Sequence, residues 1–137
     1  MENLKIITFH QGPRMRVGRS ENGAFLRIEM SHGHEEREAF QHDLLLFLEL
    51  SKPFACARNL WDLRNLEVLI DTDLQDWIDQ EVNSRQLLQG TRREAFVMPG
   101  DAIAQLAVEQ SMDEANGSRI QSAFFGSMPE AEAWLVG

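Results

Sequence analysis

The sequence predicts an α/β domain: a mixed sheet with an N-terminal antiparallel hairpin, followed by βαβαβα units whose helices flank the sheet. Three observations lead to this fold class. From residue 35 onward, segments with helical periodicity alternate with short apolar segments typical of strands. Before them, two short strands are separated by Asn22-Gly23, a pair that favours a tight hairpin turn. The stretch 54–60 is apolar on both faces except for Arg58 and Asn59, as is typical of a strand covered on both sides.

Length and charge limit the classes of protein to which this chain can belong. Its 137 residues match about one domain, so we expect a single domain over residues 1–137. The formal net charge of −9 repels phosphate backbones, which argues against a nucleic-acid partner. No apolar run approaches the ~20 residues that span a bilayer, and the N-terminus has no basic segment followed by an apolar run. We therefore expect a cytoplasmic protein that does not insert into a membrane.

The single cysteine, Cys56, excludes an internal disulfide. It lies in the apolar stretch 54–60, where a thiol acts as a small hydrophobe. The sequence shows no base that would activate it, so we expect it to be part of the core.

The first half of the chain is predicted to form three strands and one long helix. The strands are expected at Lys5–His10, Met15–Val17 and Ala24–Glu29, which are rich in β-branched and aromatic residues. The helix is expected to begin at Glu35, with three glutamates in its first turn, and to end at Lys52-Pro53. Its apolar face is formed by residues at helical spacing: Phe40, Leu44, Phe47 and Leu48.

The second half repeats a strand-then-helix unit three times. The strands are predicted at 54–60, 94–98 and 120–125, and the helices begin near Thr72, Asp101 and Ser127. Thr72-Asp-Leu-Gln75 matches a capping box, which makes Thr72 the predicted cap. The first of these helices has an apolar inner stripe, Leu74, Trp77, Ile78 and Val82, and an acidic solvent side, Asp73, Asp76, Asp79 and Glu81. The second has one predicted inner face, Ile103, Leu106, Ala107 and Gln110.

Four stretches of the second half resemble a known family. They are Trp61-Asp-Leu-Arg64, Arg93-Glu-Ala-Phe-Val97, Asp101-Ala-Ile-Ala104 and the ending from Phe124-Phe-Gly126 to Pro129–Leu135. Together they cover about 54–135 and resemble the small SpoIIAA-like bacterial proteins of the STAS (sulfate transporter and anti-sigma factor antagonist) superfamily. The resemblance implies a (β/α) superhelical layer fold and non-enzymatic regulatory or scaffolding work.

One part of the family pattern does not carry over to this chain. The anti-sigma-factor antagonists have a phosphorylated serine near the start of the helix after the central strand. This chain has Asp71-Thr72-Asp73 near that place, and two carboxylates disfavour a phosphate between them. The resemblance therefore does not extend to a phosphorylation switch.

The best candidate metal site lies at the start of the first helix. If this helix begins near His34, then His34, Glu38 and His42 recur every four residues on one face. Imidazole and carboxylate together suit zinc or a related ion. Ordinary surface histidines are the simpler interpretation, since no HExxH or Cys/His spacing is present. A hydrolase that uses His34 or His42 is the third of the functions considered.

A second candidate site lies at the carboxyl ends of the parallel strands, where ligands usually bind in open α/β sheets. These ends carry Asp62, Arg64 and Asp101, which could orient a ligand. Alternatively, Asp62 and Arg64 satisfy each other and the loop amides. An apolar pocket beside Trp77 is a related alternative, supported by the aromatic and methionine content. The chain has no glycine-rich phosphate loop, and we expect no cofactor.

The expected function is that of a non-catalytic bacterial regulatory module that binds a protein partner, with a homodimer as one form of that interaction. This follows from the lack of a convergent catalytic set and from the STAS-like pattern. Arg14, Arg16 and Arg19 make the hairpin basic, and the helix at 73–81 is acidic, so the two offer opposite charges for docking. The alternative is a domain that binds a small apolar or anionic ligand at the strand ends.

Overall fold

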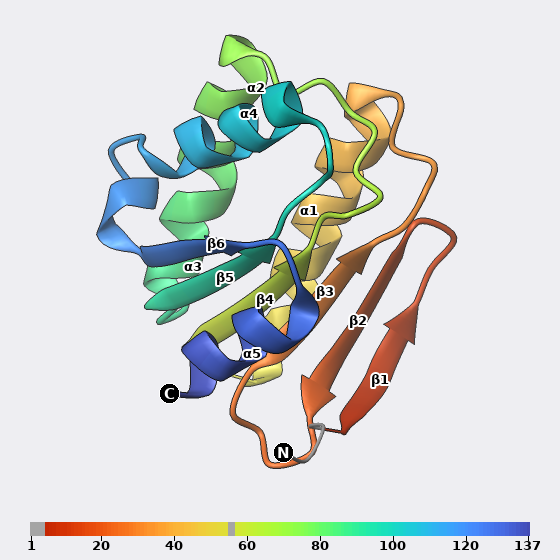
Figure 1. The fold of residues 1–137 in the computed structure, drawn as a ribbon, viewed down its shortest axis with the longest axis vertical. Coiled ribbons are helices and arrows are strands. Elements are labelled where there is room, and N and C mark those ends of the chain that lie inside the picture. Colours follow the sequence, from red (N-terminus) through yellow and green to blue (C-terminus); the bar gives the residue numbers. More distant parts are fainter. Residues whose placement is uncertain (1–4, 55–56) are drawn as a thin grey trace.

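The computed structural model describes residues 5–54 and 57–137, in which six strands form one mixed sheet (Figure 1). The strands lie side by side in chain order. Their bounds are β1 (Ile6–Gln11), β2 (Met15–Ser20), β3 (Leu26–Met30), β4 (Arg58–Asp62), β5 (Arg93–Val97) and β6 (Gln121–Phe125). The pairs β1–β2 and β2–β3 are antiparallel, whereas β3 to β6 pair in parallel. The predicted α/β class with a mixed sheet is therefore confirmed.

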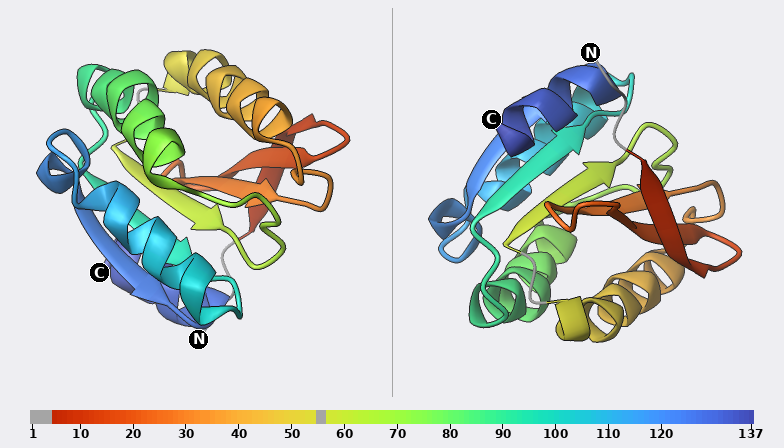
Figure 2. Two further views of the ribbon diagram at one scale, coloured as in Figure 1. Left: turned by 90° about the horizontal axis from the view of Figure 1, so that it is seen from above. Right: turned by 90° about the horizontal axis from the view of Figure 1, so that it is seen from below.

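Helices connect the parallel strands and cover the two faces of the sheet unequally. They are α1 (Arg37–Ser51), α2 (Thr72–Trp77), the π-helical η2 (Ile78–Asn83), α3 (Ser84–Leu88), α4 (Ala102–Met112) and α5 (Met128–Val136), with short 3₁₀ turns η1 (Lys52–Phe54) and η3 (Gly117–Arg119). The helices from α1 to α4 lie on one face, because right-handed crossovers between successive parallel strands return over the same side (Figure 2). Among the helices of the described ranges, α5 alone packs on the other face, against β4, β5 and β6.

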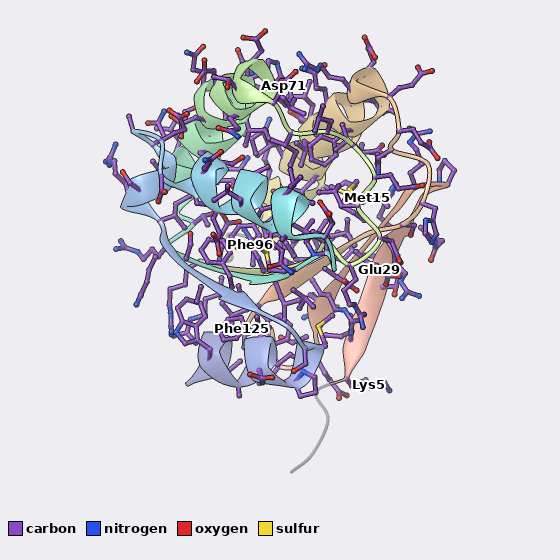
Figure 3. All side chains as sticks on the ribbon, turned by 45° about the horizontal axis from the view of Figure 1, so that its top comes forward. Lys5, Met15, Glu29, Asp71, Phe96 and Phe125 are labelled. Carbon is purple, nitrogen blue, oxygen red and sulfur yellow. The ribbon has the colours of Figure 1, made fainter. Side chains whose placement is uncertain are left out.

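Two apolar clusters fill the two faces of the sheet. On the helix-rich face, the rings of Phe47 and Trp61 meet edge to face with centroids 4.9 Å apart. Figure 3 places Phe96 on this side and Phe125 beside α5. The α5 face has a smaller cluster of buried residues: Phe25, Leu60, Ala95, Val97, Ala131 and Leu135. Alternate residues of β4 and β5 thus enter different clusters, as the pleat of a strand requires.

Two arginines hold α5 against the sheet. Arg58 donates from Nη1 to the carbonyl oxygen of Leu135 over 3.0 Å, and Arg93 donates from Nη2 to that of Trp134 over 2.9 Å. The Arg93 guanidinium also lies 4.3 Å from the centroid of the Trp134 ring. Positive charge at a helix C-terminus complements the helix dipole, so both arginines stabilise the docked helix.

The strand predicted at 54–60 lies further along the chain. Lys52–Phe54 forms a 3₁₀ turn, and β4 spans Arg58–Asp62. Phe54 is 37% exposed, so it is not part of a covered strand. The prediction placed the strand too early because it followed the apolar run from Phe54, whereas β4 begins at Arg58, whose side chain donates to the end of α5. Cys56, predicted to be buried, lies outside the described residues.

The starts of two helices also differ from the prediction. The first helix begins at Arg37, so Glu35 precedes it, and Glu38 is the acidic residue in its first turn. Asp71, not Thr72, caps α2: its carboxylate accepts the N–H of Leu74 over 2.9 Å. In contrast, the predicted cap of α5 is confirmed, since the Ser127 hydroxyl accepts from the N–H of Glu130.

The predicted solvent sides of two helices are partly wrong. Asp79, assigned to the solvent side, is buried in η2 and accepts the N–H of Gly117 over 2.7 Å. The π-helical turn changes the phase of the helix at this point, which periodicity at 3.6 residues could not anticipate. In α4, Ile103 and Leu106 are 72% and 53% exposed, whereas Val108 is buried. The inward face of α4 is therefore rotated from the predicted one.

Candidate ligand cavity

The main candidate site is a cavity of about 60 Å³ between the sheet and the helix-rich face. Its walls come from β4, β5, α1, η2 and α4 and from the loop 63–71. Most of the lining is apolar and includes Phe40, Leu44, Trp61, Ile78, Phe96 and Val108. The polar side chains in the lining are those of Asn83, Gln86, Glu94 and Ser111. An apolar cavity with a few polar groups is the general form of a small-molecule site.

Glu94 of β5 is the ionisable residue in this lining, and it is 1% exposed. Its Oε2 accepts a hydrogen bond from Trp61 Nε1 over 2.5 Å and another from Gln86 Nε2 over 2.8 Å. A longer contact of 3.4 Å comes from Asn59 Nδ2. The parallel register of β4 and β5 explains this arrangement, because it sets Asn59 beside Glu94 on the same face.

Burial governs the ionisation of Glu94. Loss of hydration raises the pKa of this carboxyl from 4.5 to about 7, while the hydrogen bonds from Trp61 and Asn59 oppose the rise. Near neutral pH, the side chain therefore exists as both the acid and the carboxylate.

The two oxygens of Glu94 have different surroundings. All three donors meet at Oε2, and Oε1 receives no hydrogen bond from the residues of 5–54 and 57–137. Nearby, Asn59 Oδ1 is buried and also lacks a partner among the same residues. The polar end of the cavity thus has two acceptor atoms without a donor, Glu94 Oε1 and Asn59 Oδ1.

A second cavity, of about 230 Å³, lies between the loop 63–71 and the start of α4. Leu66 and Ile70 line both cavities, so these two side chains lie between the outer cavity and the inner one. Leu69 and Ile103 stand at the outer cavity and are each 72% exposed. The loop 63–71 therefore separates the inner cavity from solvent.

The loop 63–71 is tied to the segment before α1 through Glu67. Its Oε1 accepts the N–H of Gly33 over 2.8 Å and lies 3.4 Å from Nδ1 of His32. The hydrogen bond from Gly33 is the main cause that lowers the pKa of Glu67, so the carboxylate form favours the closed loop.

A second tie joins the end of the same loop to α1. Asp71, which begins α2 in Figure 3, pairs with Arg37. The N–H of Leu74, which Asp71 caps, is the main cause that lowers the pKa of the aspartate. The negative charge of Asp71 therefore stabilises both the cap of α2 and the ion pair with Arg37.

The predicted ligand residues lie in two different places. Arg64 donates to Asp62 from Nε over 2.9 Å and from Nη2 over 2.7 Å, and its backbone N–H donates to Asp62 over 3.2 Å. The hydrogen bond to Asp62 is the main cause that raises the pKa of Arg64. This is the self-satisfied pair considered as the alternative. Asp62 follows Leu60 on the α5 face of β4, whereas Asp101 caps α4 and lines the outer cavity.

Two of the three hairpin arginines have acidic neighbours within the chain. Arg14 Nε lies 3.0 Å from Asp43 Oδ2, and Arg16 pairs with Glu29 on the neighbouring strand. Arg19 has no ion pair within the part of the chain that the structure describes. The basic character of this hairpin is thus largely compensated, and its role in partner binding stays a prediction.

The predicted metal residues do not converge. His34 is fully buried, and its Nε2 lies 2.6 Å from Asp43 Oδ2, whereas Glu38 and His42 are exposed on α1. The reason is that α1 starts at Arg37, so His34 is not part of the helix. Across residues 5–54 and 57–137, no group of three His, Cys, Asp or Glu side chains could hold a metal ion.

Glu94 is the residue that sequence reasoning missed. The segment 94–98 was predicted as one more apolar strand, which is correct, but the charge at its start received no role. A glutamate in a strand covered on both faces is itself a signal, because a buried carboxylate needs donors. The partners Trp61 and Gln86 come from other elements, and only the fold brings them together.

Comparisons of the chain with protein-family models, with curated proteins and with solved structures give no match. None of the helices in the described ranges combines the length and the apolar character needed to cross a bilayer. The function is therefore inferred from the geometry of the cavity.

Proposed function

We propose that this chain is a non-catalytic, SpoIIAA-like binding module that holds a small apolar ligand in the cavity beside Glu94. The observation that carries the proposal is an apolar cavity that ends at a buried carboxyl and shares Leu66 and Ile70 with an outer cavity. A natural core is close-packed, so a cavity lined by these residues is a site where added apolar atoms gain contacts. The sequence of strands and helices agrees with the layer fold that the STAS resemblance implies.

The same cavity supports binding rather than catalysis. General acid–base chemistry usually needs a second group that holds or activates the reacting atom. Among the described lining residues, Glu94 is the ionisable one, and Ser111 donates its hydroxyl proton to the carbonyl of Ala107 over 2.9 Å. The lining thus offers one titratable contact in an otherwise apolar space.

An NMR titration with toluene tests the proposal. Toluene is small, apolar and has no hydrogen-bonding group, so it reports on the cavity alone. We expect saturable shifts of the amide signals around Val108 and Phe96. The variant Val108→Phe fills the cavity and should remove these shifts. The control Val136→Phe changes an exposed position of α5 and should retain them. A wild-type protein that shows no saturable shifts would refute the cavity as a binding site.

A second candidate function is the binding of a protein partner, and one observation favours it. Leu69 and Ile103 are exposed at the outer cavity, where the loop 63–71 meets α4, and Leu106 is exposed about one helical turn after Ile103. Exposed apolar clusters of this kind often mark protein interaction sites. This surface lies at the outer cavity, so partner binding and ligand binding would involve neighbouring residues.

Self-association is the form of this second function that the chain alone can test. If the exposed cluster joins two copies, sedimentation will show a concentration-dependent dimer that Ile103→Lys abolishes. The matched control is Leu88→Lys, because Leu88 is 88% exposed at the end of α3. A monomer at every concentration would exclude a homodimer through this surface.

A further inference from the structure

We propose that the ligand of the inner cavity carries one uncharged hydrogen-bond donor, an O–H or N–H group, which Glu94 Oε1 accepts. This inference rests on the proposed function and names the chemical class of the ligand: a small, mostly apolar molecule with a donor at its inner end.

The first step is the asymmetry of the Glu94 carboxyl. Its Oε2 is saturated by Trp61, Gln86 and Asn59, whereas Oε1 receives no donor from the described residues. Glu94 is fully buried and lines the cavity, so a molecule there can reach an oxygen that bulk water does not solvate freely. A buried acceptor without a donor is costly, and a donor supplied by the ligand removes that cost.

The second step is the shortage of donors at this end of the cavity. Asn83 Nδ2 donates to Asp79 Oδ1 over 3.2 Å, and Ser111 Oγ donates to a backbone carbonyl. Trp61 Nε1 and Gln86 Nε2 already donate to Glu94. The unpaired polar atom nearby, Asn59 Oδ1, is again an acceptor. Each of these donor atoms thus already has a partner, whereas the polar atoms left without one, Glu94 Oε1 and Asn59 Oδ1, are both acceptors.

The third step excludes a charged ligand. The carboxylate form of Glu94 is already compensated by three neutral donors. A cation would have to leave water and enter a space lined mainly by aromatic and aliphatic side chains. A neutral donor avoids this cost and still forms a hydrogen bond to a charged acceptor, the stronger kind.

The fourth step identifies the protonation form that binds the donor. Because three donors occupy Oε2, the proton of the acid form belongs on Oε1, which then donates instead of accepting. The carboxylate form is therefore the stronger acceptor for the donor of the ligand. The side chains that face Glu94 from the packed elements are uncharged: Trp61 and Asn59 of β4, Gln86 of α3, Asn83 of η2 and Ser111 of α4. No nearby charge contributes to the shift of the pKa of Glu94, so its own titration sets the pH dependence.

The experiment compares pyrrole with furan, two rings of nearly equal shape of which only pyrrole has an N–H donor. We expect NMR titration at pH 8 to show about tenfold tighter binding of pyrrole, the value of one modest hydrogen bond. Between pH 8 and pH 6, pyrrole affinity should fall about fivefold, because the carboxylate fraction of a group with a pKa of about 7 falls while the acid form still binds the ring through apolar contacts. Furan affinity should stay constant.

The variant Glu94→Gln provides the matched test. The donors at the Oε2 position will hold the amide oxygen there, which leaves the amide N–H₂ towards the cavity. Pyrrole should then lose its advantage over furan at both pH values, whereas Glu109→Gln, on the exposed side of α4, should retain it. Thermal unfolding of each variant checks that it is folded, and the pH series on the wild-type protein needs no variant.

The outcomes separate the two claims. If neither ring nor toluene binds the wild-type protein, the cavity function itself is refuted. If both rings bind equally well at pH 8 and pH 6, the cavity function stands and the donor class is refuted. Tighter binding of pyrrole at pH 6 than at pH 8 would also refute it, because that result assigns the interaction to the acid form.

Discussion

Trp61 and Glu94 join two neighbouring parallel strands through a buried hydrogen bond, in which Trp61 Nε1 donates to Glu94 Oε2 over 2.5 Å. Both side chains project to the helix-rich face, and both line the inner cavity. The indole therefore has two roles, since its ring is a wall of the cavity and its N–H fixes the carboxyl. This pair makes the charge of Glu94 a determinant of both stability and binding.

Glu94→Gln should stabilise the protein at alkaline pH. The pKa of Glu94 is about 7 in the folded chain and 4.5 ordinarily, so the folded state binds the proton more tightly. Protonation of Glu94 therefore contributes stability to the folded state that is fully present below pH 4.5. This contribution is lost as the pH rises through 7, and the loss reaches about 3 kcal/mol at pH 8. Glutamine has no charge to bury. Urea unfolding should therefore show Glu94→Gln to be more stable than wild type at pH 8, with a much smaller difference at pH 5. An equal difference at both pH values would contradict the raised pKa.

Trp61→Phe should raise the pKa of Glu94 further. The hydrogen bond from Trp61 lowers this pKa, and its removal leaves burial less opposed. We also expect a loss of about 3 kcal/mol in the free energy of unfolding, because a large buried ring is truncated and a buried acceptor loses its donor. A ¹³C NMR titration of the Glu94 carboxyl measures the pKa. Trp134→Phe, on α5 and outside the cavity lining, is the control that should leave it unchanged.

Several elements of this fold were predicted from the sequence because their patterns are local. The Asn22-Gly23 turn, the Ser127 cap and the strand predicted at 94–98 depend on neighbours in sequence, and the structure confirms them, with the strand at Arg93–Val97. Gly23 has a φ of 75°, in the range that the predicted turn requires. Such signals do not need knowledge of which elements pack together.

The candidate site could not be predicted in the same way, because it depends on contacts between distant residues. Glu94 acquires its donors from β4 and α3, and Asp79 is buried because η3 lies against it. Exposed positions were also misassigned for this reason: Ile103 has the apolar character of a core residue but stands at the outer cavity. Periodicity identifies which residues share a helix face, but tertiary packing decides which face is covered.

Asp43→Ala should destabilise the protein strongly. Asp43 of α1 is buried and joins His34 Nε2, at 2.6 Å, to Arg14 Nε, at 3.0 Å. Removing the carboxylate leaves two polar groups without their shared partner, which we expect to cost about 2 to 4 kcal/mol in the free energy of unfolding. Glu38→Ala, on the exposed side of the same helix, should change it by less than about 0.5 kcal/mol. Equal effects in urea unfolding would show that the buried group of three is unimportant for stability.

Glu67→Ala should loosen the loop 63–71 and speed the exchange of ligands with the inner cavity. Glu67 accepts the N–H of Gly33, and this hydrogen bond ties the loop that separates the cavity from solvent. Without it, hydrogen exchange at the Gly33 amide should become severalfold faster. NMR lineshapes should show faster release of toluene with little change in the free energy of unfolding, since Glu67 is exposed. The control is Glu49→Ala, which breaks only an exposed pair with Lys52 at the far end of α1. If Gly33 exchange increases while toluene release does not change, the loop is tied by Glu67 but is not the route to the cavity.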